Sequence, residues 1–432
     1  MKKPLPDARA VAAALLDSVL LRRRLLDESF DADPAVAALA DRDHAFARLL
    51  AATALRRLGQ IDALIDHCLD KRLPTKSSLA LQALRLGICQ LLFLDTPPHA
   101  AISTSVEMLK HGPLAGYAGL VNAVLRRLDG EGREMVARQD AARLNTPDWL
   151  WLSWCRAYGE ETARAIATAH LSEAPTDITV AGDPAPWAER LEAELLPTGS
   201  LRRRLPGDIT RLPGFTEGAW WVQDAAAALP AHLLGDVRGL SVADLCAAPG
   251  GKALQLAAAG ARVTAVDRSG KRLVRLGQNL ARLGLAAEIV EADVTQWRPE
   301  GTFDALLLDA PCSATGTLRR HPDGLWLKSP ADVVKLSALQ GRLLAAAAGL
   351  LKPGGTLVYC VCSLEPEEGV DRVEALLAAG APFVRRPLAP EEVGGLAELV
   401  TAAGDLRTLP CHLAERGGMD AFFAARLTRV PE

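Results

Sequence analysis

The spacing of hydrophobic positions changes along the chain and predicts two kinds of structure. Over residues 6–138, apolar residues recur at intervals of three and four, as Val11, Leu15 and Val19 do. This is the spacing of one face of an α-helix, and no strand-like alternation interrupts it. We therefore expect an all-α bundle over residues 1–140.

From residue 240 onward, apolar runs of strand length alternate with helical patterns. This order predicts a parallel sheet with helices on both faces. The expected strands are 241–246, 262–267, 286–291, 303–309 and 356–361. Residues 141–235 mix short apolar runs with turns and predict a connector with a small α/β unit. The predicted domains are thus 1–140, 141–235 and 236–432.

Composition narrows the class of protein only slightly. A chain of 432 residues with 49% hydrophobic residues is expected to form more than one packed domain. Lys+Arg 49 against Asp+Glu 52 gives a formal charge of −3, so only local basic clusters can indicate nucleic-acid binding. Neither a signal peptide nor an uncharged apolar run of about 18 residues is found, which predicts a cytoplasmic protein outside the membrane. The eight cysteines form no CxxC pair, which predicts reduced thiols and no metal site.

The stretch from Asp244 to Lys252 reads DLCAAPGGK, between an apolar run and an Ala/Leu-rich helical pattern. Strand, glycine turn and helix in this order build nucleotide pockets, because glycine allows close backbone approach and a helix start offers free N–H groups. Pro-Gly-Gly alone fits an ordinary turn equally well. The candidate cofactor-binding residues here are Cys246, Ala247, Ala248, Pro249, Gly250, Gly251 and Lys252.

Aspartates stand where three later strands are expected to end. Asp267 lies about 20 residues beyond the glycine turn, where a carboxylate accepts both hydroxyls of a ribose. NAD is disfavoured because no G-x-G-x-x-G is present. S-adenosylmethionine, a nucleoside cofactor without a pyrophosphate, fits better. Asp293 is then a candidate for the adenine amino group, and Asp309 for the part of the pocket nearest the substrate.

Two Cys-Ser pairs, Cys312-Ser313 and Cys362-Ser363, follow neighbouring predicted strands. A zinc site would need more ligands at short spacing, and burial in a core is the alternative for any single cysteine. Covalent catalysis is the third interpretation. A thiolate that adds to carbon 6 of cytosine makes carbon 5 nucleophilic toward a methyl sulfonium. Asp309 is placed to stabilise the charge that develops on the ring.

Two resemblances sharpen these predictions. Residues 84–92, 95–101 and 119–127 resemble the NusB-type RNA-binding helical domain, which implies an RNA- and partner-binding bundle without a catalytic role. This makes Arg126 and Arg127 candidates for phosphate contacts, although a solvated helix face is the alternative. A second basic cluster, 202–204 in the connector, either binds phosphate or lies in solvent.

The C-terminal motifs are similar to those of RNA 5-methylcytosine methyltransferases, specifically the bacterial Sun/RsmB family that acts on 16S rRNA. The matching residues are Asp244 to Lys252, Asp267, Asn279-Leu280, Arg282-Leu283-Gly284, Asp293, Asp309 to Ser313, Arg319 to Asp323, Leu351 to Gly355 and Cys362-Ser363. The resemblance implies that Cys362 is the nucleophile and Cys312 assists breakdown of the adduct. DNA cytosine methyltransferases use the Pro-Cys cysteine instead, so attack by Cys312 stays open.

The same resemblance suggests roles for the flanking residues. Arg319, Arg320 and His321 follow the Pro-Cys loop and are candidates for positioning RNA, with a general base as the alternative role for His321. Lys252 is either a catalytic residue between cofactor and base or an ordinary lysine at a helix start. This chain has Val361 where the family has Thr and adds Cys360, which is either a spare thiol or a core residue.

The predicted fold is a Rossmann-like S-adenosylmethionine-dependent methyltransferase domain preceded by an all-α NusB-like bundle. The predicted activity is methyl transfer to carbon 5 of a cytosine in 16S rRNA through a covalent cysteine adduct at carbon 6. The expected partner is 16S rRNA or the assembling small subunit, with neither DNA nor membrane, and a monomer is expected. The alternatives are a tRNA cytosine-C5 methyltransferase and a non-catalytic RNA-binding assembly factor.

Overall fold

The computed structural model describes residues 7–205 and 207–431 and divides the chain into two compact units. The helical unit holds the residues up to Glu173 together with the segment Leu318–Lys328. The sheet unit holds Ala174–Thr317 and the residues from Ser329 onward. This division differs from the predicted one in two ways. The predicted connector, 141–235, is divided between the units after Glu173, and the segment 318–328 of the predicted C-terminal domain belongs to the helical unit. The prediction that the chain carries no signal peptide concerns a stretch that begins with residues 1–6, which lie outside the described ranges.

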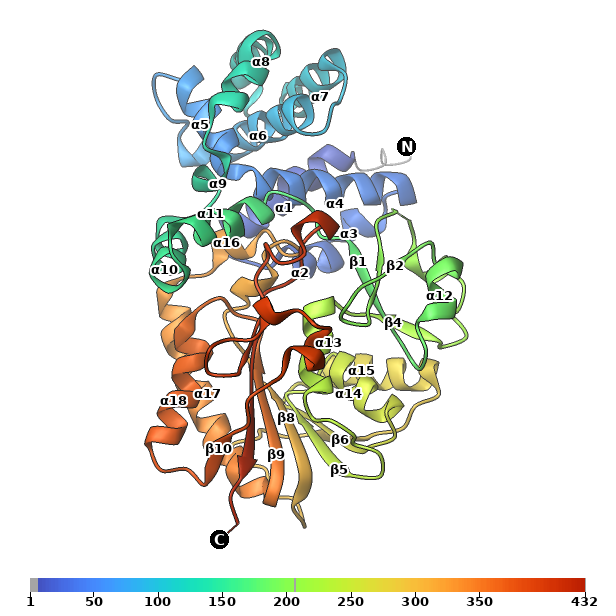
Figure 1. Cartoon of the computed structure of the whole chain (residues 1–432). Helices are drawn as coiled ribbons and strands as arrows, with labels where there is room; N and C mark the ends of the chain where they lie inside the picture. The colour runs from blue at the N-terminus through green and yellow to red at the C-terminus, as the bar shows by residue number, and fades with distance from the viewer. Residues whose placement is uncertain (1–6, 206, 432) are drawn as a thin grey trace. The chain divides into compact units, whose positions relative to one another are not determined.

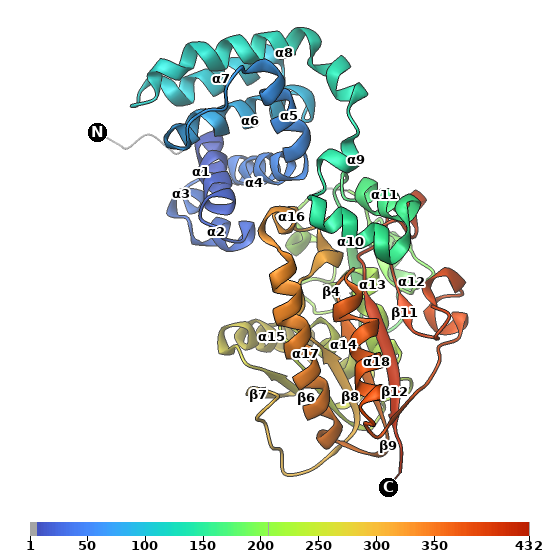
Figure 2. The ribbon, with the colours of Figure 1, turned by 90° about the vertical axis from the view of Figure 1, so that its left-hand side faces the viewer.

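The helical unit is all-α over its described residues, as the spacing of apolar positions predicts. Buried leucines from four different helices form its core, among them Leu16, Leu50, Leu84 and Leu125, each 0% exposed. Figure 2 shows the long helix α8 beside α6 and α7. The helices are α1 Ala8–Leu20, α2 Leu26–Ala32, α3 Pro34–Ala37, α4 Asp41–Arg56, α5 Leu58–Cys68, α6 Ser78–Leu92, α7 Pro98–Lys110, α8 Ala118–Arg138, α9 Ala141–Leu144, α10 Asp148–Tyr158, α11 Glu160–Ala169 and α16 Gly324–Leu327.

The segment 318–328 is anchored within the helical unit by hydrogen bonds to backbone groups. The Trp326 indole donates to the carbonyl of Leu55 at 2.8 Å. The Asp323 carboxylate accepts the backbone N–H of Leu26 at 3.0 Å. These bonds satisfy backbone groups at the C-terminal end of α4 and the N-terminal end of α2, so the segment is a structural part of this unit.

The main sheet of the other unit contains every strand that the sequence predicts, at nearly the predicted positions. Its order is β10-β12-β9-β8-β5-β6-β7, with β11 paired to β12. Neighbouring strands in the stretch β9-β8-β5-β6-β7 pair in parallel. Strand β12 is antiparallel to its partners β9, β10 and β11. The bounds are β5 Ser241–Leu245, β6 Arg262–Asp267, β7 Glu288–Glu291, β8 Phe303–Asp309, β9 Leu351–Val361, β10 Phe383–Arg385, β11 Leu406–Arg407 and β12 Phe423–Arg429.

The five predicted strands pair in parallel, as expected, and the antiparallel strands at the C-terminal edge are an addition that the sequence does not predict. A parallel neighbour requires a crossover connection, usually a helix. The chain between β10 and β12 contains only short 3₁₀ turns and the two-residue strand β11, so it returns antiparallel instead. The 3₁₀ turns of the protein are η1 Thr75–Ser77, η2 Ala115–Tyr117, η3 Ile209–Arg211, η4 Thr315–Thr317, η5 Pro366–Glu368, η6 Pro390–Val393, η7 Ala397–Leu399 and η8 Ala414–Arg416.

Helices cover both faces of the main sheet (Figure 1). Alternate residues of each strand enter opposite cores, so Leu307 packs with one helix layer and Leu306 and Leu308 pack with the other. One layer is α13 Ala225–His232, α14 Gly251–Ala258 and α15 Gly270–Leu283. The other is α17 Pro330–Leu350 and α18 Val370–Ala378.

Helix α17 is the one helix among the described residues that is long and apolar enough to cross a membrane by length and composition. Its residues Leu343, Leu344 and Ala347 are buried in the core against the sheet. This packing accounts for its apolar composition.

A four-stranded sheet, in the order β2-β3-β1-β4, forms the small α/β unit predicted in the connector. Its core contains Ile178, Leu191, Leu201 and Trp220. The elements are β1 Thr176–Val180, α12 Ala185–Arg190, β2 Glu194–Leu195, β3 Leu201–Arg203 and β4 Trp220–Val222.

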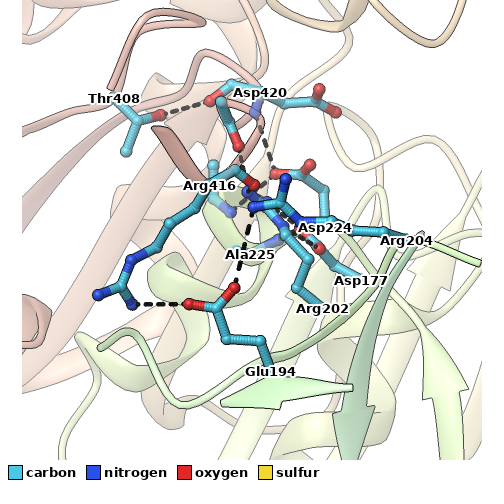
Figure 3. A network of polar contacts seen from close by, with 11 residues as sticks. Asp177, Glu194, Arg202, Arg204, Asp224, Ala225, Thr408, Arg416 and Asp420 are labelled. Atoms are coloured by element: carbon cyan, nitrogen blue, oxygen red, sulfur yellow. Dashed lines mark hydrogen bonds and ion pairs between the residues drawn. The ribbon is translucent and has the colours of Figure 1, made fainter. Parts of the chain in front are cut away.

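The basic cluster 202–204 is mainly structural, which corrects both interpretations made from the sequence. Arg202 pairs with Asp177 at 2.7 Å, and neither side chain is exposed. Arg202 also donates to the carbonyl of Arg416 at 3.0 Å (Figure 3) and to that of Gly418, so it joins the small sheet to the C-terminal segment before β12. Arg203 is buried as well, and only Arg204 is exposed. A buried guanidinium needs this full set of acceptors, and therefore Arg202 is unavailable to phosphate.

Candidate active site

The glycine loop, residues 246–251, connects β5 to α14 and has the geometry of a close-approach turn. Gly250 has φ 114°, a conformation that side chains with a Cβ rarely adopt. A Cβ added there would lie 2.9 Å from Cγ of Leu276, so the fold also leaves no room for a larger residue. Cys246 has φ 65°, which turns the chain sharply at the end of the strand. The sequence-predicted turn is thus a constrained loop and not an adaptable one.

Asp267 lies at the end of β6 and faces this loop. Its carboxylate accepts the backbone N–H of Ala248 at 3.2 Å and that of Ser269 at 2.9 Å. The Arg272 guanidinium lies 3.4 Å from the same carboxylate. These contacts fix the orientation of Asp267, and its side chain is only 3% exposed.

A cavity of about 100 Å³ brings together cofactor candidates that are distant in sequence. Cys246, Asp267 and Asp293 contribute its polar edge, and Leu339 and Leu343 contribute an apolar wall. A pocket with one apolar side and convergent carboxylates suits a ring system that carries hydroxyl and amino groups.

Asp293 follows β7 and is exposed. Its side chain accepts the backbone N–H of Thr295 at 2.9 Å and the Thr295 hydroxyl at 2.7 Å. These hydrogen bonds hold the pKa of Asp293 below its usual range, so the group is an ionised acceptor at neutral pH.

Lys252 and Asp309 form an ion pair between the first turn of α14 and the end of β8. Lys252 Nζ lies 2.7 Å from Asp309 Oδ2 and 5.0 Å from the centroid of the Phe422 ring. Burial by itself would lower the pKa of Lys252, but the Asp309 carboxylate outweighs it and the net direction is upward. Lys252 therefore stays protonated beside a carboxylate that is 31% exposed.

The two Cys-Ser motifs meet, as their positions after neighbouring strands predict. Cys312 Sγ and Cys362 Sγ are 3.4 Å apart. Backbone hydrogen bonds from Ala310 to Cys360 and from Gly316 to Cys362, each 3.0 Å, hold the Pro-Cys loop against the end of β9. The hydrogen bond with Cys362 and burial raise the pKa of Cys312 well above its usual range. The two sulfurs are thus close enough to share a hydrogen bond, in which either thiol can be the donor.

Cys360 is a fully buried core residue on the same face of β9 as Val358. Its Sγ also lies 3.6 Å from Asp309 Oδ1, a contact that the sequence does not predict. Burial, followed by the Asp309 charge, raises the pKa of Cys360 well above its usual value, so it remains a neutral thiol.

Glu368 is the residue that sequence reasoning misses. It is 0% exposed, and its carboxylate binds Ser313 and Ser363, the residues that directly follow the two cysteines. The repeated Cys-Ser pair was the available signal, but nothing in the sequence indicates a shared partner for the serines.

The predicted RNA-binding residues all lie in the helical unit. Arg126 and Arg127 are exposed on α8, where Arg127 pairs with Glu131. In the segment 318–328, Arg319 is 1% exposed, and this burial argues against a direct phosphate contact.

The two residues after Arg319 are more accessible. Arg320 is half-buried, and His321 is exposed. The His321 ring lies 3.3 Å from the carboxylate of Asp27. Within the described ranges there is no group of three His, Cys, Asp or Glu side chains that could hold a metal ion.

The parallel core sheet, the glycine loop after β5 and the carboxylates after β6, β7 and β8 define a Rossmann-like methyltransferase domain. Residues 231–428 match the family model of the 16S rRNA methyltransferase RsmB/F, and residues 6–129 match that of the NusB family. The chain belongs to the RsmB/F methyltransferase family, with a NusB-family domain at its N-terminal end.

Individual relatives support this placement over most of the chain. Ribosomal RNA small subunit methyltransferase B of Sodalis glossinidius is 36% identical over 395 residues, covering 86% of this chain and 89% of the relative. The protein of the same name from Cronobacter sakazakii is 35% identical over 399 residues, covering 88% and 91%.

Two solved structures are similar in fold. PH0851 has a TM-score of 0.75 at 22% identity and covers 99% of both chains. A methyltransferase homolog from Pyrococcus horikoshii has a TM-score of 0.56 at 26% identity and covers 67% of this chain and 98% of its own.

Proposed function

We propose that the protein transfers a methyl group from S-adenosylmethionine to carbon 5 of a cytosine in small-subunit rRNA. The observation that carries this proposal is the pair of thiols, Cys312 and Cys362, 3.4 Å apart at the same sheet edge as the Lys252–Asp309 pair. The relatives named above act on small-subunit rRNA according to their names.

The residues at the sheet edge fit S-adenosylmethionine. The glycine loop is constrained for close approach, Asp267 offers oxygens for the ribose, and Asp293 offers an ionised acceptor for the adenine amino group. When bound, the cofactor supplies an electrophilic methyl sulfonium. The three proposed binding elements come from the ends of β5, β6 and β7, where ligands bind in open α/β sheets.

In the proposed reaction, Cys362 attacks and Cys312 assists release. The Cys362 thiolate forms a bond to carbon 6, and the displaced electron pair makes carbon 5 nucleophilic. Carbon 5 takes the methyl group from the sulfonium, whose sulfur–methyl bond breaks to leave the neutral thioether S-adenosylhomocysteine. A base then removes the proton from carbon 5, and the bond between carbon 6 and the Cys362 sulfur breaks as the ring double bond re-forms. The 3.4 Å separation of the two sulfurs supports a joint role, because a thiol at this distance can stabilise a neighbouring thiolate by hydrogen bonding. The assignment of Cys362 as the nucleophile follows the family resemblance.

Asp309 is proposed to contact ring nitrogen 3 and the exocyclic amine of the cytosine. Lys252 and Cys360 hold its two oxygens, at 2.7 and 3.6 Å, so the carboxylate is pre-oriented. Pre-orientation is valuable because no reorganisation is then needed as charge develops in the transition state.

The helical unit is proposed to bind the RNA. The accessible candidates for contacts to the RNA backbone are Arg126 and Arg127 on α8 and Arg320 and His321 in the segment 318–328. Arg319 is buried and is proposed to anchor that segment. The target cytosine must be unpaired or flipped to reach a thiolate. We further propose that the protein acts as a cytoplasmic monomer on 16S rRNA or on an assembling small subunit.

The test is a methylation assay with purified protein, cofactor and either 16S rRNA, small-subunit particles or bulk tRNA. Mass spectrometry of nucleosides then measures 5-methylcytidine. We expect product from 16S rRNA or the particles and none from tRNA. Product from tRNA alone would transfer the proposal to the tRNA enzymes, and binding without product would favour the assembly-factor alternative.

A further inference from the structure

Glu368 occupies a buried polar cluster directly behind the two thiols. Its Oε1 accepts the backbone N–H of Ser313 at 2.8 Å. Its Oε2 accepts the hydroxyls of Ser313 and Ser363, both at 2.5 Å. The carboxylate of Glu368 therefore binds the Pro-Cys loop and the turn after β9, in each case at the serine that follows the cysteine.

Further hydrogen bonds complete the cluster. Gln340 donates to Glu368 at 3.3 Å and to the carbonyl of Pro311 at 2.9 Å. The Thr315 hydroxyl lies 3.3 Å from Ser363 Oγ and accepts the backbone N–H of Leu364 at 3.0 Å. The Pro-Cys loop and the turn after β9 are thereby joined through side chains as well as through backbone.

This cluster is costly to bury, which argues that it serves a purpose beyond stability. Glu368, Ser313 and Ser363 are each 0% exposed. Burial raises the pKa of Glu368, while the serine hydrogen bonds oppose that shift. Apolar residues of similar volume would fill the same space without an ionisable group, and buried polar networks of this kind specify one geometry.

We propose that Glu368 is a positioning residue that holds Cys312 and Cys362 at their working separation by clamping Ser313 and Ser363. The inference rests on the proposed function of the thiol pair and adds the element that sets its geometry. Consecutive Cα atoms are about 3.8 Å apart, so a shift of either serine moves the adjacent cysteine almost directly. A misplacement of about 1 Å at reacting groups can cost roughly 100-fold in rate.

The first test measures the thiol separation without requiring catalysis. The full-length protein is treated briefly with diamide, a diazene oxidant, and then quenched and alkylated. Each disulfide that forms releases two protons and two electrons from two thiols, and the diazene is reduced to the hydrazine. Peptide mapping by mass spectrometry follows the Cys312–Cys362 disulfide over time. We expect rapid formation in the unmodified protein and several-fold slower formation in Glu368→Ala.

Matched variants separate positioning from general destabilisation. Glu392→Ala removes a different carboxylate of the sheet unit, one that pairs with Arg426 at 2.5 Å, and should leave the cross-linking rate unchanged. Ser363→Ala keeps Glu368 but removes the hydrogen bond from the Ser363 hydroxyl, so it should slow cross-linking less than Glu368→Ala does. Should Glu368→Ala fail to fold, Ser363→Ala and Glu368→Gln carry the same comparison.

A second test uses the reaction itself. In Glu368→Gln, kcat for 5-methylcytidine formation should fall while KM for RNA stays within error, because the RNA surface is untouched. Cross-linking at the unmodified rate in both Glu368 variants would overturn the proposal, as would equal slowing in Glu392→Ala. If the unmodified protein methylates no RNA, the proposed function fails, but the cross-linking result still decides the role of Glu368.

Discussion

Lys252 Nζ donates to Asp309 Oδ2 at 2.7 Å, which joins the helix after the glycine loop to the strand before the Pro-Cys loop. The pair links the proposed cofactor side of the site to the proposed cytosine side. Its members are 57 residues apart in sequence, so only the fold brings them together.

Replacing Lys252 should therefore impair both stability and turnover. Lys252→Met breaks an ion pair whose lysine is only 9% exposed, and we expect a loss of about 2–4 kcal/mol in the free energy of unfolding. Urea denaturation measures this loss. The matched control is Lys352→Met, which breaks the more exposed pair with Asp304 (2.6 Å) and should cost about 1 kcal/mol or less. Equal losses would contradict the proposed importance of the buried pair.

The buried carboxyl of Asp244 should make stability depend on pH. Burial, with a further contribution from the Asp309 charge, raises its pKa from 3.8 to about 8. Because the folded state binds this proton more tightly, the stabilisation is complete below about pH 4 and is lost as pH rises toward 8. Asp244→Asn removes the titration, so its stability relative to the unmodified protein should rise between pH 5 and pH 8.

The control for this prediction is Asp304→Asn. The hydrogen bond from Lys352 lowers the pKa of Asp304, so that carboxyl is ionised in both states across the same pH interval. Its stability difference should stay flat from pH 5 to pH 8. Parallel pH profiles for Asp244→Asn and the unmodified protein would show that Asp244 does not titrate in this range.

Loss of the buried Arg202–Asp177 pair should destabilise the sheet unit strongly. Arg202→Met leaves the Asp177 carboxylate, which is 0% exposed, without its guanidinium, and breaking such a pair costs about 3–5 kcal/mol. Arg204→Met is the neighbouring control, because Arg204 is exposed and lies 3.9 Å from Glu194. Chemical denaturation should show a change of about 1 kcal/mol or less for Arg204→Met. Comparable changes in the two variants would argue against a structural role for Arg202.

The exposed arginines of α8 should contribute to RNA affinity through charge. The double variant Arg126→Ala/Arg127→Ala should weaken binding to 16S rRNA fragments and reduce the salt dependence of the binding constant, since fewer counterions are released. Filter binding at several salt concentrations measures both effects. Arg138→Ala, which changes an exposed arginine near the end of the same helix, is the control. Identical salt slopes for all proteins would place the RNA elsewhere.

The sequence predicts the central strands closely because each is an apolar run bounded by a turn or an aspartate, as β6 and β8 show. It cannot predict that β12 inserts antiparallel, because partner choice depends on a connection without local signals. Contacts between residues distant in sequence are also why the structural roles of Arg202 and Arg56 could not be predicted. Asp177 is 25 residues from Arg202, and Arg56, which donates to the Arg319 carbonyl, lies 263 residues away from it.

The candidate site was likewise predictable from the sequence only in part. The proximity of Cys312 and Cys362 could be predicted because the two residues follow the ends of neighbouring parallel strands. The clamp by Glu368 could not, because it depends on side-chain directions in a 3₁₀ turn, η5, that periodicity does not reveal. The contact between Cys360 and Asp309 escapes prediction for a similar reason, since it requires the register of β8 against β9.

The most direct measurement of the covalent mechanism is a denaturing gel of protein incubated with labelled 16S rRNA and S-adenosylmethionine. Cys312→Ala should accumulate an RNA–protein band, because the adduct forms at Cys362 and is resolved slowly. Cys362→Ala should show neither the band nor 5-methylcytidine, although Cys360 and Cys312 are still present. A band in Cys362→Ala that disappears in Cys312→Ala would contradict the account, because Cys312 would then be the nucleophile.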